Sequence, residues 1–287
     1  MTALESDRDD APGALRALAG QLATEAAEFV RRRRQEVFVD APAAAGAVRT
    51  KTSPTDPVTV VDTETERLLR DRLAELRPGD AILGEEEGGA VRAPAGRPVW
   101  VLDPIDGTVN FMYGIGAYAV SVGVQVDGVS VAGAVANVAT GEVFSAALGH
   151  GAVLTRDGGS TALRCNTIDE LPMALVGTGF AYGRDRRRVQ AAAVAELLAE
   201  VRDIRRVGSC ALDLCMVAAG RLDAYFESGV HVWDWAAGAL VAAEAGAVVR
   251  LPEPSSGTTD SADDLIVAAA PGVAGALADQ LARVGYR

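Results

Sequence analysis

The spacing of apolar and polar positions divides the chain into a helical first part, a run of strands and a mixed final third. From Leu15 to Val37, apolar residues recur at helical spacing, which predicts one amphipathic helix. A second helix is expected after Asp62, with acidic residues in its first turn and an end at Pro78 and Gly79. A short strand is predicted at 81–83.

The pattern in the middle of the chain predicts a strand meander. Residues 99–102 form a compact apolar run that stops at Asp103, which predicts a strand followed by a turn. Valines then alternate with small or polar residues from 120 to 126, up to Asp127-Gly128, a strong hairpin signal. More strands are expected through Val153. Function should be sought where the strand at 99–102 ends.

The final third mixes both kinds of element. A strand is predicted at 175–177, helices at 187–200 and 209–219, and another helix after Asp234. Residues 252–264 are rich in Ser, Thr, Asp and Gly, which indicates a surface loop. The predicted fold class is therefore α/β, in its α+β form.

Composition narrows the class of protein. The 287 residues fit one or two intimately packed domains, and no stretch approaches the roughly 20 apolar residues of a membrane span. No secretory signal is visible at the N-terminus, so we expect a cytoplasmic protein without membrane contacts. Cys165, Cys210 and Cys215 fit neither a disulfide framework nor a zinc motif, and we expect reduced thiols.

Charge argues against nucleic-acid binding. The net charge is −12, so the phosphate backbone would be repelled unless a strong basic patch intervened. The one candidate patch is Arg31–Arg34, which we interpret as a solvated helix face because Glu28 and Glu36 flank it. Lys51 is the only lysine among 27 basic residues. A compact ammonium suits some sites that a broad guanidinium does not, and we assign Lys51 a supporting role in its loop.

Five carboxylates stand at the ends of apolar segments, where a folded chain could bring them together. These residues are Asp62, Glu85, Asp103, Asp106 and Asp234. Such a cluster offers only oxygen ligands, which suit hard cations such as Mg²⁺. Taken singly, the first and last would rather be interpreted as helix N-caps and Glu85 as part of a solvated acidic loop. Their joint occurrence favours the metal site.

The segment 103–108, Asp-Pro-Ile-Asp-Gly-Thr, combines two functions in one turn. Asp103 and Asp106 flank a proline-stiffened turn, so both are expected to point at one metal pair. Gly107 permits close backbone approach, and the amides of Gly107 and Thr108 would offer donors to an anionic phosphate.

These motifs resemble those of the inositol monophosphatase family, the superfamily of Mg-dependent, lithium-sensitive phosphatases that also includes fructose-1,6-bisphosphatases. The matching segments are 84–86, Gly-Glu-Glu, 100–111, Trp-Val-Leu-Asp-Pro-Ile-Asp-Gly-Thr-Val-Asn-Phe, and 233–234, Trp-Asp. The resemblance implies a layered α/β/α/β sandwich, usually dimeric. It implies an N-terminal half at 15–153 with most metal ligands and a C-terminal half at 154–287 on the substrate side. Residues 1–14 fall outside the resemblance and are expected to form an acidic disordered tail.

The resemblance also implies ligands and a mechanism. Two to three Mg²⁺ ions are expected: Glu85, Asp103 and the Ile105 carbonyl would bind the first, while Asp103, Asp106 and Asp234 would bind a second. A third, weaker ion would lie near Glu85. Thr108, with Asp62, would polarise the attacking water near Glu85.

Further residues are implied to contact the leaving group, a small phosphorylated polyol. Glu227 matches a position that binds substrate hydroxyls, and Gly208, Ser209 and Cys210 match a loop lining the same pocket. Asp106 and Asp234 would touch substrate as well as metal. Lithium inhibition is expected from the same resemblance.

The leading interpretation is therefore hydrolysis of inositol 1-phosphate by a homodimer. Fructose 1,6-bisphosphate, histidinol phosphate and 3′-phosphoadenosine 5′-phosphate are alternative substrates of this scaffold. A regulatory protein that binds the transcription machinery is the alternative of a different class. The complete set of expected metal ligands favours catalysis.

Overall fold

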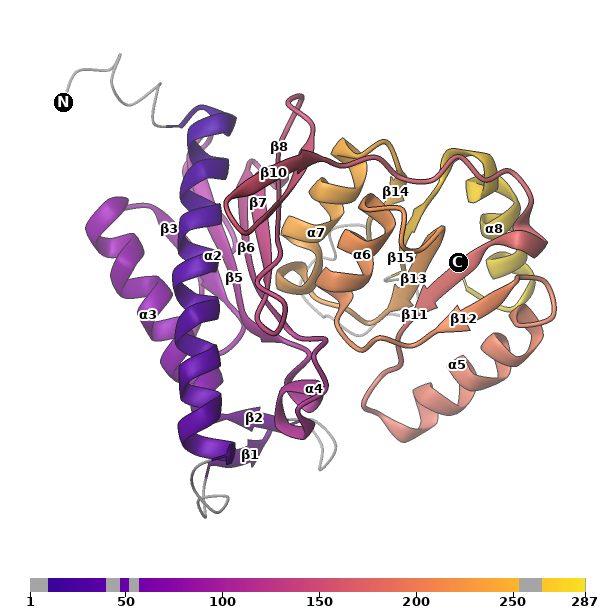
Figure 1. The fold of residues 1–287 in the computed structure, drawn as a ribbon, viewed down its shortest axis with the longest axis horizontal. Coiled ribbons are helices and arrows are strands. Elements are labelled where there is room, and N and C mark those ends of the chain that lie inside the picture. Colours follow the sequence, from indigo (N-terminus) through magenta and orange to yellow (C-terminus); the bar gives the residue numbers. More distant parts are fainter. Residues whose placement is uncertain (1–9, 40–46, 52–56, 253–264, 287) are drawn as a thin grey trace.

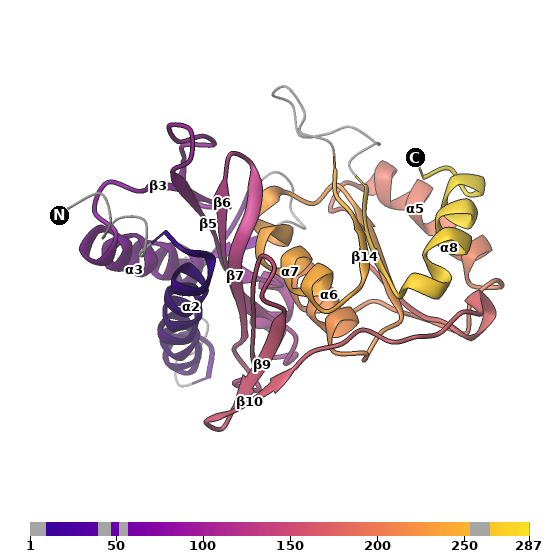
Figure 2. The same cartoon turned by 90° about the horizontal axis from the view of Figure 1, so that it is seen from above.

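The computed structural model describes residues 10–39, 47–51, 57–252 and 265–286. Helices and sheets alternate in layers (Figure 1). Helices α2 and α3 cover one face of a large sheet, α6 and α7 lie between that sheet and a smaller one, and α5 and α8 cover the outer face of the smaller sheet (Figure 2). The predicted α/β/α/β sandwich is thus confirmed, with α5 and α8 as a further outer layer.

The helices have the following bounds: α2 (Pro12–Arg34) with its π-helical continuation η1 (Gln35–Val39), α3 (Val60–Leu76), α4 (Thr108–Tyr113), the 3₁₀ turn η2 (Leu171–Met173), α5 (Arg184–Leu197), α6 (Cys210–Ala218), α7 (Val232–Glu244) and α8 (Pro271–Arg283).

The large sheet has eight strands and contains the predicted meander. In spatial order they are β10 (Gly159–Ala162), β9 (Ala152–Arg156), β8 (Val143–Ala147), β7 (Val129–Asn137), β6 (Ala119–Val126), β5 (Pro98–Asp106), β3 (Ala81–Gly84) and β4 (Gly88–Gly89). Only β3 and β5 run parallel to one another. The other neighbours are antiparallel, including β6 and β7 around the predicted Asp127-Gly128 turn.

The smaller sheet has five strands. In spatial order they are β12 (Asp203–Arg205), β11 (Leu175–Thr178), β13 (Ala224–Ser228), β15 (Leu265–Ala269) and β14 (Val248–Arg250). β11 is parallel to both of its neighbours, and β15 is antiparallel to its own. A separate pair, β1 (Val48–Thr50) and β2 (Pro57–Thr59), precedes α3.

The hydrophobic core lies between the layers of helices and sheets. Apolar residues of α2, among them Leu15 and Leu22, pack against Trp100 of β5 and against three valines of β6, and all of those named are at most 1% exposed: Val120, Val122 and Val124. Small residues let the central helices approach closely: a Cβ on Gly133 would lie 2.8 Å from the Cα of Ala237 on α7. This close packing holds the first turn of α7 against the end of β5.

Several predicted boundaries shift. The first helix begins at Pro12 rather than residue 15, because proline suits the first helical turn, so the tail predicted at 1–14 is already helical at its end. Strand β9 crosses the boundary predicted at 153, and the large sheet continues to Ala162. The loop predicted at 252–264 lies outside the described residues beyond Pro252, as do residues 1–9 of the tail.

Arg31 and Arg32 are exposed, in agreement with the predicted solvated face, whereas Arg33 and Arg34 are half-buried. Arg31 donates to the carbonyl of Val138 at 2.7 Å, and Arg34 donates to the carbonyl of Phe111 at 2.8 Å. Long arginine side chains bury their stems and carry the guanidinium to distant acceptors, which a local charge pattern cannot show. None of the helices in the described part of the chain combines the length and apolarity that a bilayer span requires.

Candidate active site

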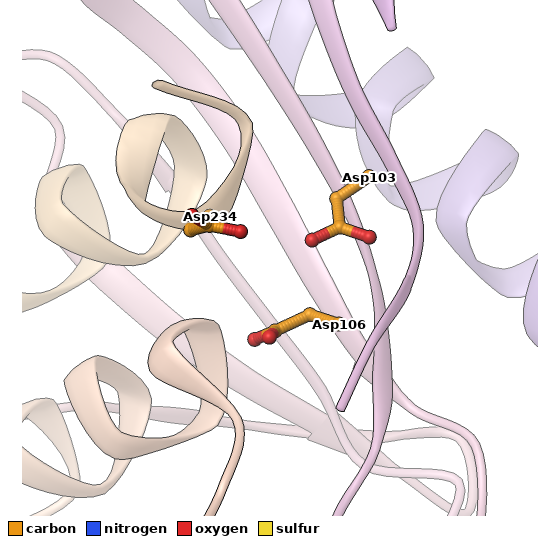
Figure 3. A group of neighbouring side chains, drawn as sticks. All are labelled: Asp103, Asp106 and Asp234. Carbon is orange, nitrogen blue, oxygen red and sulfur yellow. The ribbon is translucent and has the colours of Figure 1, made fainter. Parts of the chain in front are cut away.

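Strand β5 carries two of the predicted ligands and continues through both, instead of stopping at Asp103. Asp103 pairs with Ser121 of β6, whereas Asp106 pairs with Ala119, so three steps along β5 match two along β6. Residues three apart in a regular strand point to opposite faces. The extra residue of this β-bulge cancels that alternation, and both carboxylates face the same side (Figure 3).

Helix α7 supplies a third carboxylate. Asp234 lies in its first turn, and ligand oxygens of Asp103, Asp106 and Asp234 all lie within 4.8 Å of one another. Figure 3 shows the three side chains directed towards a common space between β5 and the starts of two helices. Three of the five predicted carboxylates are thereby brought together.

Nearby donors fix one oxygen of each carboxylate. Oδ1 of Asp103 accepts the Ile105 N–H at 3.0 Å, and Oδ2 of Asp234 accepts the His231 N–H at 2.5 Å. His231 therefore caps α7 through its backbone, consistent with a structural role.

Asp106 is tied to helix α6. Its Oδ2 accepts the Ser209 hydroxyl at 2.6 Å and the Ala211 N–H at 2.7 Å. Ser209 also accepts the Leu212 N–H as N-cap of α6. The resemblance implied that Ser209 lines the substrate pocket, but the structure places it behind Asp106, where it orients that carboxylate.

The three carboxylates destabilise one another's charge. Burial, reinforced by repulsion from neighbouring carboxylates, raises the pKa of Asp103 and Asp234 well above the ordinary range. Burial likewise raises the pKa of Asp106 to about 7, although its bonds from Ser209 and Ala211 oppose the shift. Within the described residues no lysine or arginine forms an ion pair with any of the three. An all-oxygen cluster with this deficit of positive charge fits a hard divalent cation.

Glu85 stands beside this cluster, in the turn after β3. It contributes to the raised pKa of Asp103, both by charge and by a hydrogen bond. Lys51 donates to Glu85 at 2.8 Å and to Glu86 at 2.5 Å. Burial disfavours the ammonium, but the two carboxylates outweigh it and raise the pKa of Lys51. Lys51 thus forms an ion pair with the Glu85 turn, while residues 52–56 of the loop that it was predicted to support lie outside the described residues.

Asp62 and Thr108 form a buried pair next to the cluster. Asp62 is the third residue of α3 and is 0% exposed; its Oδ2 accepts both the N–H and the hydroxyl of Thr59. The Thr108 hydroxyl lies 3.1 Å from Oδ1 of Asp62 and 3.1 Å from the Ile105 carbonyl oxygen. Burial raises the pKa of Asp62 to about 7. The carboxylate is thus suited to exchange a proton near neutral pH.

Gly107 joins the strand to the short helix α4. Its φ of 95° favours glycine, and a Cβ there would lie 2.9 Å from the Ala117 carbonyl oxygen. The neighbouring Asn110 amide donates to the carbonyls of Ala117 and Val207 at 2.7 and 2.9 Å. Asn110 therefore fastens this turn to the loop before α6, a role that the sequence did not reveal.

A cleft of about 730 Å³ opens over these residues. Its lining includes the sequence-predicted Glu85, Asp103, Ile105, Asp106, Gly107, Thr108, Lys51, Gly208, Cys210, Glu227 and Asp234. Asp62 lies behind Thr108 rather than on the wall. Arg186 and Arg206, which sequence reasoning missed, also line the cleft. They are separated from the acidic motifs in the sequence, so no local pattern marked them.

Glu227 also lines the cleft, although it is far from Glu85 in the sequence. It lies on β13 of the smaller sheet. Its Oε2 accepts the Tyr225 hydroxyl at 2.5 Å, and burial raises its pKa despite this bond and the charge of Arg206. A Cβ on Gly179 would overlap the Glu227 carboxylate, so a side chain at this position would displace Glu227. Tyr225 and Gly179 together set the position of Glu227, and sequence reasoning missed both.

A layered fold with a buried, all-oxygen carboxylate cluster at a cleft is typical of metal-dependent hydrolases. A sequence model of the inositol monophosphatase family matches residues 14–285, so the chain belongs to that family. Inositol-1-monophosphatase of Mycobacterium leprae is 65% identical over 96% of each chain. The solved structure of Mycobacterium tuberculosis SuhB is 57% identical, with a TM-score of 0.81 over 96% of this chain and 99% of that one.

A more distant relative bears a different name. Nus factor SuhB of Vibrio cholerae is 36% identical over 77% of this chain and 81% of its own. The family resemblance inferred from the motifs is confirmed, together with the phosphoric monoester hydrolase class.

Proposed function

We propose that this protein hydrolyses inositol 1-phosphate to inositol and phosphate with Mg²⁺ as cofactor. The observation that carries the proposal is the convergence of Asp103, Asp106 and Asp234 without a cationic partner among the described residues, in a chain 65% identical to an inositol-1-monophosphatase. Glu227 at the cleft wall, fixed by Tyr225, supports a leaving group rich in hydroxyls.

The ligand assignment is the one that the family resemblance implies. Glu85, Asp103 and the Ile105 carbonyl would hold one Mg²⁺, Asp106 and Asp234 together with Asp103 a second, and a third, weaker ion would lie near Glu85. Bound Mg²⁺ would lower the pKa of water and neutralise charge on the phosphate.

The chain's own residues would orient the water and the phosphate. When the Thr108 hydroxyl donates its proton to ionised Asp62, its lone pairs are free to accept a proton from the attacking water. The amides of Gly107 and Thr108 would donate to phosphate oxygens. As the water oxygen bonds to phosphorus, its proton passes through the Thr108 hydroxyl to Asp62, the bond to the ester oxygen breaks, and the leaving alkoxide takes a proton from a solvent water to become the alcohol.

Phosphate release is the test of this proposal. Inositol 1-phosphate, fructose 1,6-bisphosphate, histidinol phosphate and 3′-phosphoadenosine 5′-phosphate would each be assayed with Mg²⁺ and with EDTA, using wild type and Asp106→Asn. We expect Mg²⁺-dependent release, fastest from inositol 1-phosphate, that the variant lacks. A faster rate on another substrate would reassign the enzyme, and no release from any of them would contradict the proposal.

Lithium inhibition, a homodimer and a cytoplasmic location complete the proposal. The three free cysteines are typical of a reducing compartment. Tyr113 and Ile115, 77% and 55% exposed beside α4, offer apolar surface for self-association. An unchanged rate in millimolar LiCl would contradict the first expectation, and a monomeric mass in light scattering would contradict the second.

A binding role is the second candidate, because two of the relatives are named Nus factor SuhB. If it holds here, Asp106→Asn would lose hydrolysis and still retain a protein partner in a pull-down. Loss of the partner together with hydrolysis, or no partner in either form, would argue against this role.

A further inference from the structure

A buried glutamate outside the proposed ligand set contacts the turn that carries Glu85. Glu66 lies on α3, one turn after Asp62, and is 0% exposed. A carboxylate removed from water in this way is costly unless hydrogen bonds and opposite charge compensate it. The partners of Glu66 therefore indicate what it does.

Those partners belong to the turn after β3. Oε2 of Glu66 accepts the Glu86 N–H at 2.7 Å, and Oε1 accepts the Glu87 N–H at 3.0 Å. Arg70 completes the arrangement: it donates to Oε1 of Glu66 at 2.9 Å and to the Gly88 carbonyl at 2.5 Å. The two amides directly after Glu85 are thus held by one carboxylate, whose own position is held by an arginine.

Gly84, directly before Glu85, lies against the same carboxylate and leaves room for it. A Cβ at this position would overlap the Glu66 carboxylate, and the three nearest heavy atoms to it all belong to Glu66. The φ of Gly84 lies outside the left-handed region that favours glycine. Glycine is therefore required here by the presence of Glu66, and not by the backbone conformation.

We propose that Glu66 is a positioning residue for Glu85, and that Gly84 is glycine in order to admit the Glu66 carboxylate. The backbone of the 85–87 turn is clamped from the protein side by Glu66, which leaves the Glu85 side chain directed at the cleft. The inference rests on the proposed role of Glu85 as a metal ligand. It adds two residues to the machinery that prepares this ligand before any ion binds.

A double-mutant cycle on metal affinity tests the proposal, with Glu66→Ala, Gly84→Ala and the combined variant. Mn²⁺ serves as the probe because it shares the preference of Mg²⁺ for oxygen ligands. Its dissociation constant is measured from the electron paramagnetic resonance signal of the free ion, without substrate. Residues that orient a ligand typically change metal affinity by about 10- to 100-fold, and we expect losses of this size in each single variant.

The combined variant gives the sharpest result. Without the Glu66 carboxylate, the three atoms that an alanine at 84 would overlap are gone, so the second substitution should add less than about twofold to the loss from Glu66→Ala alone. Such non-additivity is the signature of two residues that act through one contact. Multiplied losses, or single variants that bind Mn²⁺ as tightly as wild type, would overturn the proposal.

Glu64→Ala is the matched control, since it lies on the same helix and pairs with Arg33 away from the turn. Its Mn²⁺ affinity should equal that of wild type. The melting temperature of each metal-free variant is recorded alongside, because a merely structural role would lower it and leave the affinity unchanged. If Glu66→Ala does not fold, Gly84→Ala alone decides. Failure of wild type itself to bind Mn²⁺ would overturn the proposed metal site, and this inference with it.

Discussion

The carboxylates that line the cleft are held in two different ways, first at the residues of β5 and α7, called the metal end, and second at Glu227 on β13, called the polyol end. At the end formed by β5 and α7, Asp106 and Asp234 each have one oxygen fixed by donors from a helix start, while the other oxygen accepts no hydrogen bond within the described residues. At the β13 end, Glu227 is paired with the Tyr225 hydroxyl at 2.5 Å, and Arg206 adds favourable charge.

This difference separates two kinds of site. Carboxylates that face one another without a counter-charge are unstable until a cation joins them, so that end is prepared for metal. A carboxylate held by a neutral hydroxyl keeps acceptor capacity for a neutral donor, which suits the hydroxyl groups of a polyol. Substitutions at the two ends should therefore alter different kinetic parameters.

The largest effect is expected at the metal end. Asp234→Asn removes one negative ligand, and because bound metal contributes several kcal/mol to transition-state stabilisation, kcat should fall at least about 100-fold. Steady-state phosphate release with Mg²⁺ measures it. Asp279→Asn, an exposed change on α8, is the control and should leave the rate intact. A fall of less than about threefold in Asp234→Asn would remove this residue from the metal site.

An intermediate effect is expected at the polyol end. Glu227→Ala removes a charged acceptor worth about 1.5–3 kcal/mol, so KM for inositol 1-phosphate should rise about 10- to 100-fold. p-Nitrophenyl phosphate, whose leaving group lacks such hydroxyls, should be hydrolysed as by wild type. An equal loss of activity on both substrates would show that Glu227 does not bind the leaving group.

A smaller effect should follow when only the support of Glu227 is removed. Tyr225→Phe deletes one hydrogen bond worth about 0.5–1.5 kcal/mol, so the same KM should rise about 2- to 10-fold with kcat nearly unchanged. KM and kcat are again measured with inositol 1-phosphate and with p-nitrophenyl phosphate. A fall in kcat on both would mean that Tyr225 acts on the metal end as well.

The last prediction concerns stability and pH. Because the native state of the metal-free protein holds protons on Asp62 and Asp106 up to a pKa of about 7, it binds more protons than the unfolded chain above pH 4. Stability must then fall as pH rises through that window. We expect the metal-free melting temperature to drop by roughly 5 °C between pH 5 and pH 8, as for a loss of a few kcal/mol in a protein of this size.

Mg²⁺ should reverse that drop, and calorimetry with and without the ion checks both statements. Asp106→Asn should flatten the pH dependence, because an amide cannot ionise. A melting temperature that stayed constant or rose across this range would contradict the raised pKa values.

The residues of the metal end could be predicted from the sequence, but the orientation of their side chains could not. Carboxylates at the ends of apolar segments marked Asp103, Asp106 and Asp234, and these residues converge. The β-bulge that turns two of them to one face was not predictable, since bulges depend on the register with β6, which no local pattern specifies.

Buried supporting residues were missed for a related reason. Glu66 is followed four residues later by Arg70, the spacing of an ordinary exposed ion pair on a helix, so nothing in the sequence marks it as buried. Tyr225 and Gly179 come from separate strands and meet Glu227 only in the folded sheet. Ligands can be read from motifs, whereas the contacts that orient them arise from tertiary packing.

The most direct test of the central claim is a Mg²⁺ titration of phosphate release from inositol 1-phosphate by wild-type protein first stripped with EDTA. The account predicts no release without the ion and saturable recovery as Mg²⁺ is added. Release that persists in EDTA, or that Mg²⁺ fails to restore, would contradict a metal site built from these carboxylates.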